Sequence, residues 1–194
     1  MKSLSPVYLI WNLHRGHFPL SIFETERLVL RQMTADDAEF ICKLVNEPSF
    51  LRFIGDKGVR NEADAVQYIQ NGPVANYQRF GFGQYVVELK NERVPIGMCG
   101  LTRKDALPAP DVGFAFLPEF WSKGYAFEAA SAVMTYSRNV LGLRKLVAVT
   151  LPDNESSIKL LEKIGLKFER LICMSEDASE LRLHTSDIDH EEKA

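Results

Sequence analysis

The segment that most constrains this chain is the loop Phe120-Trp-Ser-Lys-Gly-Tyr-Ala126. An apolar run over residues 111–117 precedes it and ends at Pro118, which predicts a strand. After it, small and apolar residues recur at helical spacing until Gly142: Ala126, Ala129, Ala130, Val133, Met134, Ser137 and Leu141. The loop therefore leads into a helix N-terminus, where backbone N–H groups lack partners and carry partial positive charge.

Two interpretations of this loop are open. A helix N-terminus of this kind can bind phosphate, to which the ammonium of Lys123 would add a charge. Alternatively, the segment is a tight turn in which Gly124 supplies an unusual backbone conformation and Lys123 points into solvent.

The composition bounds the kind of protein. A length of 194 residues suffices for one sizeable hydrophobic core, and 46% apolar with 25% charged residues is typical of a globular protein. A net charge of −3 gives no field that favours nucleic acid, and no apolar run is long enough to span a membrane. We therefore expect neither nucleic-acid nor membrane partners.

The cysteines and the chain ends add three expectations. Cys42, Cys99 and Cys173 lie far apart, which predicts reduced thiols in a cytoplasmic protein. The apolar stretch near the N-terminus is interrupted by Pro6 and lacks a signal-peptide cleavage site. We expect an extension over residues 1–20, one domain over 21–186 and an acidic tail over 187–194.

The periodicities predict a mixed α/β domain, with elements in the order β-α-α-β-β-β-α-β-α-β-β. Asn71-Gly-Pro73 is expected to end the second helix. One parallel crossover is expected, between the strands at 111–117 and 145–151, beside the loop at Gly124. The predicted strands cover 27–31, 83–89, 95–101, 111–117, 145–151, 168–174 and 180–184, and the helices follow Thr34 and cover 62–69, 126–141 and 156–164.

Several familiar sites are absent from the sequence. It has no Walker-type phosphate loop, and Gly81-Phe-Gly83 precedes a strand instead of following one, as a dinucleotide fingerprint would. All four histidines lie near the termini, so we expect neither a histidine-based triad nor a metal site. They are His14, His17, His184 and His190.

A second group of polar residues opens the helix after the strand at 145–151. Ser157 lies on the helical face that also carries Leu160, Leu161 and Ile164, so a hydroxyl is placed where burial is expected. Ser157 can serve a ligand or bond back to a backbone carbonyl, and Asn154 can serve a ligand or cap the helix.

The strand at 111–117 also has two unlike faces. Gly113 and Ala115 share one face, and Val112, Phe114 and Phe116 share the other. A face of small residues allows a ligand to approach closely, although a bulge or a tight helix contact gives the same pattern.

Taken together, these features resemble the GNAT superfamily of acyl-CoA-dependent N-acyltransferases, and within it the RimJ/RimL-like branch of ribosomal-protein N-terminal acetyltransferases. The resemblance covers roughly residues 24–184 and rests on four ordered blocks. Trp121 stands where the superfamily usually has Arg or Gln, which is common in this branch, and Leu166 replaces a frequent Phe. The blocks are Glu24-Thr-Glu-Arg-Leu-Val-Leu-Arg31, Pro95-Ile-Gly-Met-Cys-Gly100, Val112-Gly-Phe with Pro118-Glu-Phe-Trp-Ser-Lys-Gly-Tyr-Ala126, and Asn154-x-x-Ser157 with Leu161-Glu-Lys-Ile-Gly165.

This resemblance implies a GNAT-like fold, acetyl-CoA as cosubstrate, and roles for individual residues. The amides of Lys123, Gly124, Tyr125 and Ala126 would bind the CoA pyrophosphate. The main chain near Phe114, Phe116 and Leu117 would pair with the pantetheine arm like an added strand. Asn154 would hold that arm, and Ser157 would protonate or stabilise the departing thiolate. Backbone N–H groups of the same strand would meet the oxyanion.

The chemistry of acyl transfer requires a neutral amine. Deprotonating an α-amine of pKa near 8 at pH 7 costs about 1 kcal/mol, whereas a lysine side chain costs roughly 4 to 5 kcal/mol. Asp111 is the best candidate base, acting through water, and it can equally be a loop carboxylate after Pro110.

The sequence thus predicts acetyl transfer from acetyl-CoA to a primary amine by direct attack, by a monomer or homodimer. The branch favours a protein N-terminus as acceptor, and small amines are possible. Glu62, Asp64 and Asp105 could attract a cationic acceptor. The rival predictions are a non-catalytic acyl-CoA-binding or interaction domain and a nucleotide-binding regulator.

Overall fold

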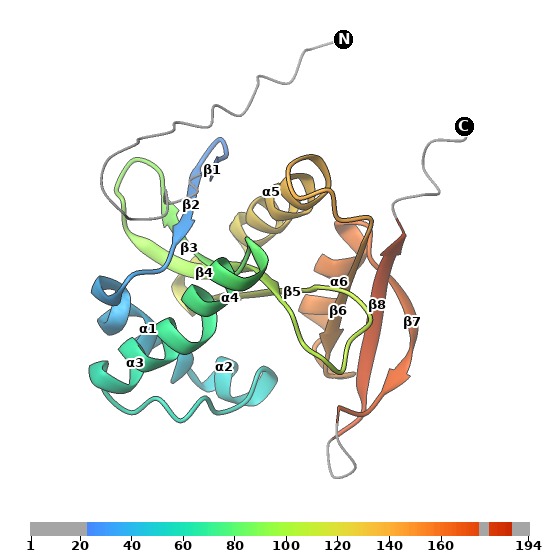
Figure 1. The fold of residues 1–194 in the computed structure, drawn as a ribbon, viewed down its shortest axis with the longest axis horizontal. Helices are drawn as coiled ribbons and strands as arrows, with labels where there is room; N and C mark the ends of the chain where they lie inside the picture. The colour runs from blue at the N-terminus through green and yellow to red at the C-terminus, as the bar shows by residue number, and fades with distance from the viewer. Residues whose placement is uncertain (1–22, 175–178, 188–194) are drawn as a thin grey trace.

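The strands form one mixed sheet. The computed structural model describes residues 23–174 and 179–187, and within these ranges eight strands lie in the order β1-β2-β3-β4-β5-β6-β8-β7 (Figure 1). Neighbouring strands are antiparallel except β5 and β6, the parallel pair that the sequence predicts. Their bounds are β1 Phe23–Glu24, β2 Leu28–Gln32, β3 Gln84–Leu89, β4 Pro95–Thr102, β5 Asp111–Phe116, β6 Lys145–Thr150, β7 Lys167–Ile172 and β8 Leu181–Asp187.

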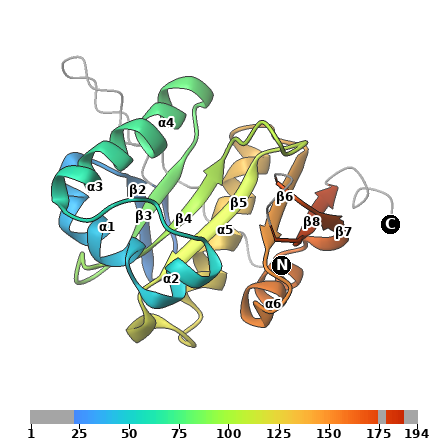
Figure 2. The same cartoon turned by 90° about the horizontal axis from the view of Figure 1, so that it is seen from below.

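Helices cover both faces of this sheet. Figure 2 shows α1, α2, α3 and α4 on one side of strands β2 to β5, and α5 on the other. The helices are α1 Ala38–Val45, α2 Pro48–Phe53, α3 Glu62–Ile69, α4 Ala75–Phe80, α5 Tyr125–Asn139 and α6 Glu155–Lys163, with short helical turns η1 Ala35–Asp37, η2 Gln70–Val74 and η3 Pro118–Phe120.

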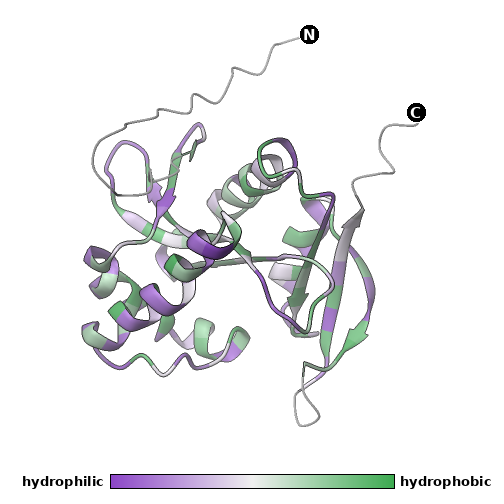
Figure 3. Cartoon of the chain, viewed as in Figure 1, coloured by the Kyte–Doolittle hydropathy of each residue, from purple (hydrophilic) through white to green (hydrophobic). Residues whose placement is uncertain are grey.

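The two larger of three hydrophobic clusters among the described residues lie on opposite faces of the sheet, because side chains alternate along the strands. Val87 packs with Ala129 and Val133 under α5, whereas its neighbour Val86 packs with Ile41 under α1 and α3. Hydrophobic and hydrophilic residues accordingly alternate along α1 and α3 (Figure 3). The mixed α/β fold and the predicted element order are confirmed.

The structure corrects the prediction that Asn71-Gly-Pro73 ends the second helix. The chain continues from α3 through a π-helical turn, η2, into α4, and ends only at Gly81, whose φ is +77°. Pro73 has no N–H to donate. The wider π-helical turn accommodates it without ending the helix. The Asn76 side chain donates to the carbonyl of Gly72 at 3.0 Å and adds a hydrogen bond to this turn.

Other differences are additions. The sequence analysis missed β1 and α2, which are short, although Pro48 at the first position of α2 is a typical helix start. The last strand runs to Asp187 instead of ending at His184. His184 is fully buried in β8, next to the ring of Phe168.

The predicted extension over residues 1–20 and nearly all of the predicted acidic tail lie outside the described residues, as do His14, His17 and His190. All three cysteines are free. No helix in the described part of the chain is both long and apolar enough to cross a bilayer.

Candidate active site

The loop before α5 leaves its backbone amides without partners in the helix. Ser122 and Gly124 both adopt positive φ, +59° and +83°. The first helical bond runs from the N–H of Glu128 to the carbonyl of Gly124 at 3.0 Å, so the N–H groups of residues 125–127 have no acceptor in the helix. Gly124 is the N-cap and brings no side chain to cover them. The loop therefore has the geometry of an anion-binding helix N-terminus.

Arg27 fastens this loop to the β1–β2 hairpin. Its Nη1 donates to the carbonyl of Lys123 at 3.0 Å, its Nε pairs with Glu128 Oε2 at 2.7 Å, and its guanidinium lies 4.7 Å from the ring centroid of Tyr125. Burial acts to raise the pKa of Glu128, but hydrogen bonds from Thr25 and Arg27 outweigh it and lower that pKa. Glu128 is thus held as the anionic partner of Arg27.

The side chains of Trp121 and Lys123 pack against residues that precede them in the chain. The Trp121 Nε1 donates to the carbonyl of Phe116 at 2.7 Å, and the Lys123 ammonium lies 5.3 Å from the ring centroid of Phe120. The hydrogen bond of the Trp121 indole therefore connects the loop to the C-terminal end of β5.

Some backbone N–H and C=O groups of β5 point toward the side where β5 and β6 separate, and they are not bonded to β4. These two strands pair at one position, Asp111 with Val147. The N–H of Leu117 donates to the carbonyl of Ile96 in β4 at 3.0 Å. Because backbone groups alternate in direction along a strand, those of Phe114 point away from β4, toward the separation.

The other two predicted backbone positions on β5 are more restricted. Both backbone groups of Leu117 are occupied, since its carbonyl accepts from Phe120 at 3.0 Å. Phe116 retains only its N–H, because Trp121 occupies its carbonyl.

A cavity of about 420 Å³ begins at this separation. It brings together Asp111, Phe114, Asn154 and Ser157, four residues that lie in two separate segments of the sequence. Its wall on the other side comes from α2, α3, η2 and α4, including Phe50, Phe53, Tyr68, Pro73 and Asn76. The predicted loop residues 123–126 do not line it, so they form a separate part of the site.

Asn154 and Ser157 occupy the α6 wall of this cavity. Asn154 caps α6, since its side-chain oxygen accepts from the Ser157 N–H at 3.2 Å, and its amide group remains to serve a ligand. The Ser157 hydroxyl makes no hydrogen bond to the described residues, so the alternative that it bonds back to a carbonyl is wrong. Both of the predicted side chains therefore offer a donor to the cavity.

Asp111 is 5% exposed at the start of β5. Its Oδ2 accepts from Lys104 Nζ at 2.5 Å, while its Oδ1 is buried without a partner. Burial raises the pKa of Asp111. The charge and the hydrogen bond of Lys104 oppose this, and so does a hydrogen bond from the backbone of Val149. A buried carboxylate with a raised pKa and an unpartnered oxygen is suited to accept a proton.

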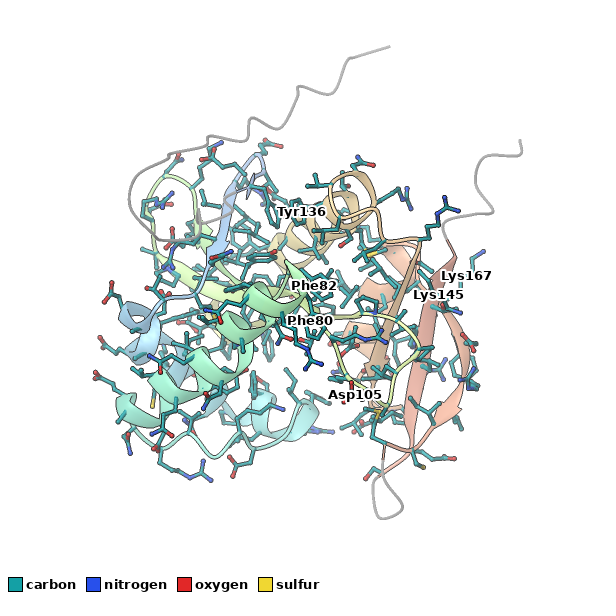
Figure 4. All side chains as sticks on the ribbon, viewed as in Figure 1. Phe80, Phe82, Asp105, Tyr136, Lys145 and Lys167 are labelled. Atoms are coloured by element: carbon teal, nitrogen blue, oxygen red, sulfur yellow. The ribbon has the colours of Figure 1, made fainter. Side chains whose placement is uncertain are left out.

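Other predicted and unpredicted residues complete the description. Glu62, Asp64 and Asp105 do not line the cavity; Asp105 lies on the β4–β5 connection (Figure 4). Lys57 and Lys104 do line it. No sequence pattern pointed to them, because loop lysines are usually solvated. In the described ranges, no three His, Cys, Asp or Glu side chains gather as a metal site requires.

Comparison with known proteins identifies the family. Residues 27–167 match the acetyltransferase (GNAT) domain. The chain belongs to the GNAT acetyltransferase family. It is similar to an uncharacterized N-acetyltransferase of Bacillus subtilis, YoaA, at 32% identity over 154 residues, which cover 78% of this chain and 85% of YoaA.

Solved GNAT structures share the fold. An acetyltransferase from Agrobacterium tumefaciens superposes with a TM-score of 0.73 at 23% identity, covering 90% of this chain and 98% of its own. RimL, a ribosomal L7/L12 alpha-N-protein acetyltransferase in complex with coenzyme A, gives a TM-score of 0.74 at 18% identity, covering 85% and 96%. The expected GNAT fold and transferase class are confirmed.

Proposed function

We propose that this GNAT enzyme transfers the acetyl group of acetyl-CoA to a primary amine, and that the favoured acceptor is the α-amine of a protein N-terminus. The observation that carries the proposal is the cavity itself, which joins the open backbone of Phe114, the unbonded Ser157 hydroxyl and the unpartnered Asp111 oxygen. RimL, named for α-N-protein acetylation, supports the choice of acceptor.

The residues fit an acyl-CoA. The open amides at Gly124 would bind its pyrophosphate, and the carbonyl of Phe114, with the remaining N–H of Phe116, would bind its pantetheine arm as an added strand. The Asn154 amide would donate to a carbonyl of that arm. Leu117, which has no unused backbone group, is left out of this contact. Acetyl-CoA supplies the thioester that the amine attacks.

Each proton of the transfer has a residue to handle it. The amine nitrogen forms a bond to the acetyl carbon and the carbon–sulfur bond breaks. Asp111 takes the proton that the amine loses, directly or through water. Ser157 protonates the departing thiolate and regains a proton from water, or stabilises the thiolate by donating a hydrogen bond. The N–H of Phe114 would stabilise the oxyanion. Deprotonating an α-amine at pH 7 costs only about 1 kcal/mol of free energy, so a weak base suffices.

The donor is tested by thermal shift with acetyl-CoA, CoA, ATP and NAD in parallel. Saturation at 100 times Kd stabilises the native state by about 2.7 kcal/mol, or about 5–10 °C for a protein of this size. We expect a shift with acetyl-CoA and CoA and none with ATP or NAD. A shift with the nucleotides alone would indicate the nucleotide-binding regulator.

Turnover is tested by mass spectrometry of acetylated peptides. We expect acetylation at the α-amine of unblocked N-terminal peptides and none of lysine side chains in N-terminally blocked ones. Binding of acetyl-CoA without acetylation of any amine would favour the non-catalytic domain instead.

A further inference from the structure

The part of the cavity around Asp111 carries an excess of positive charge. Lys57, from the α2–α3 connection, and Lys104, from the β4–β5 connection, both line it. Lys104 is paired with Asp111. Lys57 has no carboxylate partner among the described residues, and its ammonium contacts only the carbonyl of Ile54 at 3.4 Å.

Lys57 is an exposed side chain that also lines the cavity. Partial burial of its ammonium and the charge of Lys104 both lower the pKa of Lys57. An anion bound between Lys57 and Lys104 would relieve the repulsion between the two ammonium groups through charge-assisted hydrogen bonds.

A charge count indicates which acceptor fits. Among the described residues that line the cavity, the charged ones are Lys57, Lys104 and Asp111, which sum to +1. An amine that bears one carboxylate carries −1 in its reacting, neutral-amine form and balances this charge. A polyamine would bring further cations toward Lys57, and the acids that could attract one, Glu62, Asp64 and Asp105, lie outside the cavity wall.

We propose that the acceptor is an amine carrying an anionic group, in the simplest case a carboxylate, and that Lys57 binds this group while the amine faces Asp111. This inference rests on the proposed function and names the substrate class of the same cavity. Asp111 Oδ1, buried and unpartnered, is the acceptor for the amine N–H. Phe50, Phe53 and Met98 give the cavity an apolar wall, and polar side chains such as Asn76 and Gln84 line it elsewhere, so an acceptor with an apolar portion fits.

Two sources supply this chemistry. A free amino acid presents its own α-carboxylate beside the amine, and a polypeptide N-terminus presents an acidic side chain at one of its first positions. Both place one anion within a few bonds of an α-amine, which is the feature that Lys57 would recognise.

Two matched acceptor pairs test the inference. One pair is leucine and leucinamide, and the other is an Ala-Asp-Leu peptide amide and its Ala-Asn-Leu counterpart. We expect the charged member of at least one pair to be acetylated with about tenfold higher kcat/KM, and the pair that shows the preference identifies the source.

Variants of Lys57 connect that preference to the proposed contact. Lys57→Gln should remove the preference mainly by raising KM for the charged member, with the neutral member unaffected, and Lys57→Arg should retain it. Lys167→Gln is the matched control, because Lys167 is exposed on β7 at the sheet edge (Figure 4).

Equal rates for the charged and neutral members would overturn the inference, and so would a preference that survives in Lys57→Gln. Failure of the proposed function gives a different result, because no member of either pair would then be acetylated although acetyl-CoA binds.

Discussion

The loop before α5 and the lysine-lined end of the cavity are built in opposite ways. The loop uses consecutive residues, 122–127, and presents backbone N–H groups. The cavity end uses side chains from three connections and strands, Lys57, Lys104 and Asp111, which meet only in the folded protein. A site made of backbone groups can be predicted from a short stretch of sequence. A site made of side chains from distant segments cannot, because it depends on how those segments pack.

This contrast has a consequence for mutation. The loop depends on conformation, so it should be sensitive at Gly124 and tolerant of changes to exposed side chains nearby. The cavity depends on particular side-chain groups, so substitutions that remove a single polar atom should change activity there without changing the backbone. The following predictions test this division.

The largest effect is expected at Ser157. Ser157→Ala removes the proposed proton donor and should lower turnover by about 100-fold, while the affinity for acetyl-CoA stays nearly constant. Steady-state kinetics and a binding titration measure the two quantities. Thr135→Ala on α5 is the control and should retain activity, because among the described residues the Thr135 hydroxyl bonds only to the Ser131 carbonyl and lies outside the cavity wall. Unchanged turnover in Ser157→Ala would remove Ser157 from the mechanism.

The next effect is expected at Gly124, where φ is +83° and an added Cβ would lie 3.3 Å from Arg27 Nη2. Gly124→Val should weaken acetyl-CoA binding by about tenfold, because a left-handed β-branched residue costs roughly 1–2 kcal/mol or distorts the loop. Calorimetric titration measures the affinity.

Gly142→Val is the matched control for Gly124. Gly142 also has positive φ, +64°, but an added Cβ there would meet nothing within 4 Å, and it lies beyond the far end of α5. Its variant should lose stability without losing affinity. An equal loss of affinity in both variants would show that Gly124 acts only through general strain.

A smaller effect is expected at Arg27, which holds the loop through Lys123 and Glu128. Arg27→Gln should weaken acetyl-CoA binding by about two- to fivefold, since partly exposed ion pairs contribute little individually. Lys159→Gln, which breaks the exposed pair with Glu155 on α6, should leave the affinity unchanged. A loss as large as that of Gly124→Val would mean that side chains, not backbone, organise the loop.

The smallest effect concerns the pH dependence of stability at Asp111. Because burial raises its pKa in the folded state, the native protein binds more protons than the unfolded chain above about pH 4, the ordinary value for aspartate. The contribution of Asp111 to stability therefore decreases as pH rises through this window. In Asp111→Asn this decrease is absent, so the Tm of the variant relative to wild type should rise from pH 4 to pH 7. A falling difference would show that the pairing with Lys104 outweighs burial.

The fold was largely predictable because its signals are local. Alternation of polar and apolar residues predicted the strand at 27–31, and helical spacing predicted α5. The continuation of α3 through Pro73 into α4 was not predictable, since packing against the sheet stabilises a turn that Pro and Gly disfavour by themselves.

The sequence by itself determined the family, the loop at Gly124 and the placement of Asn154 and Ser157 at the start of a helix, because these depend on neighbouring residues and backbone conformation. Only the tertiary structure decided that Asp111 keeps an unpartnered oxygen, that Leu117 has no backbone group to offer, and that Lys57 and Lys104 share a cavity with Ser157. Burial and charge proximity depend on how distant segments pack, and no local pattern in the chain encodes that packing.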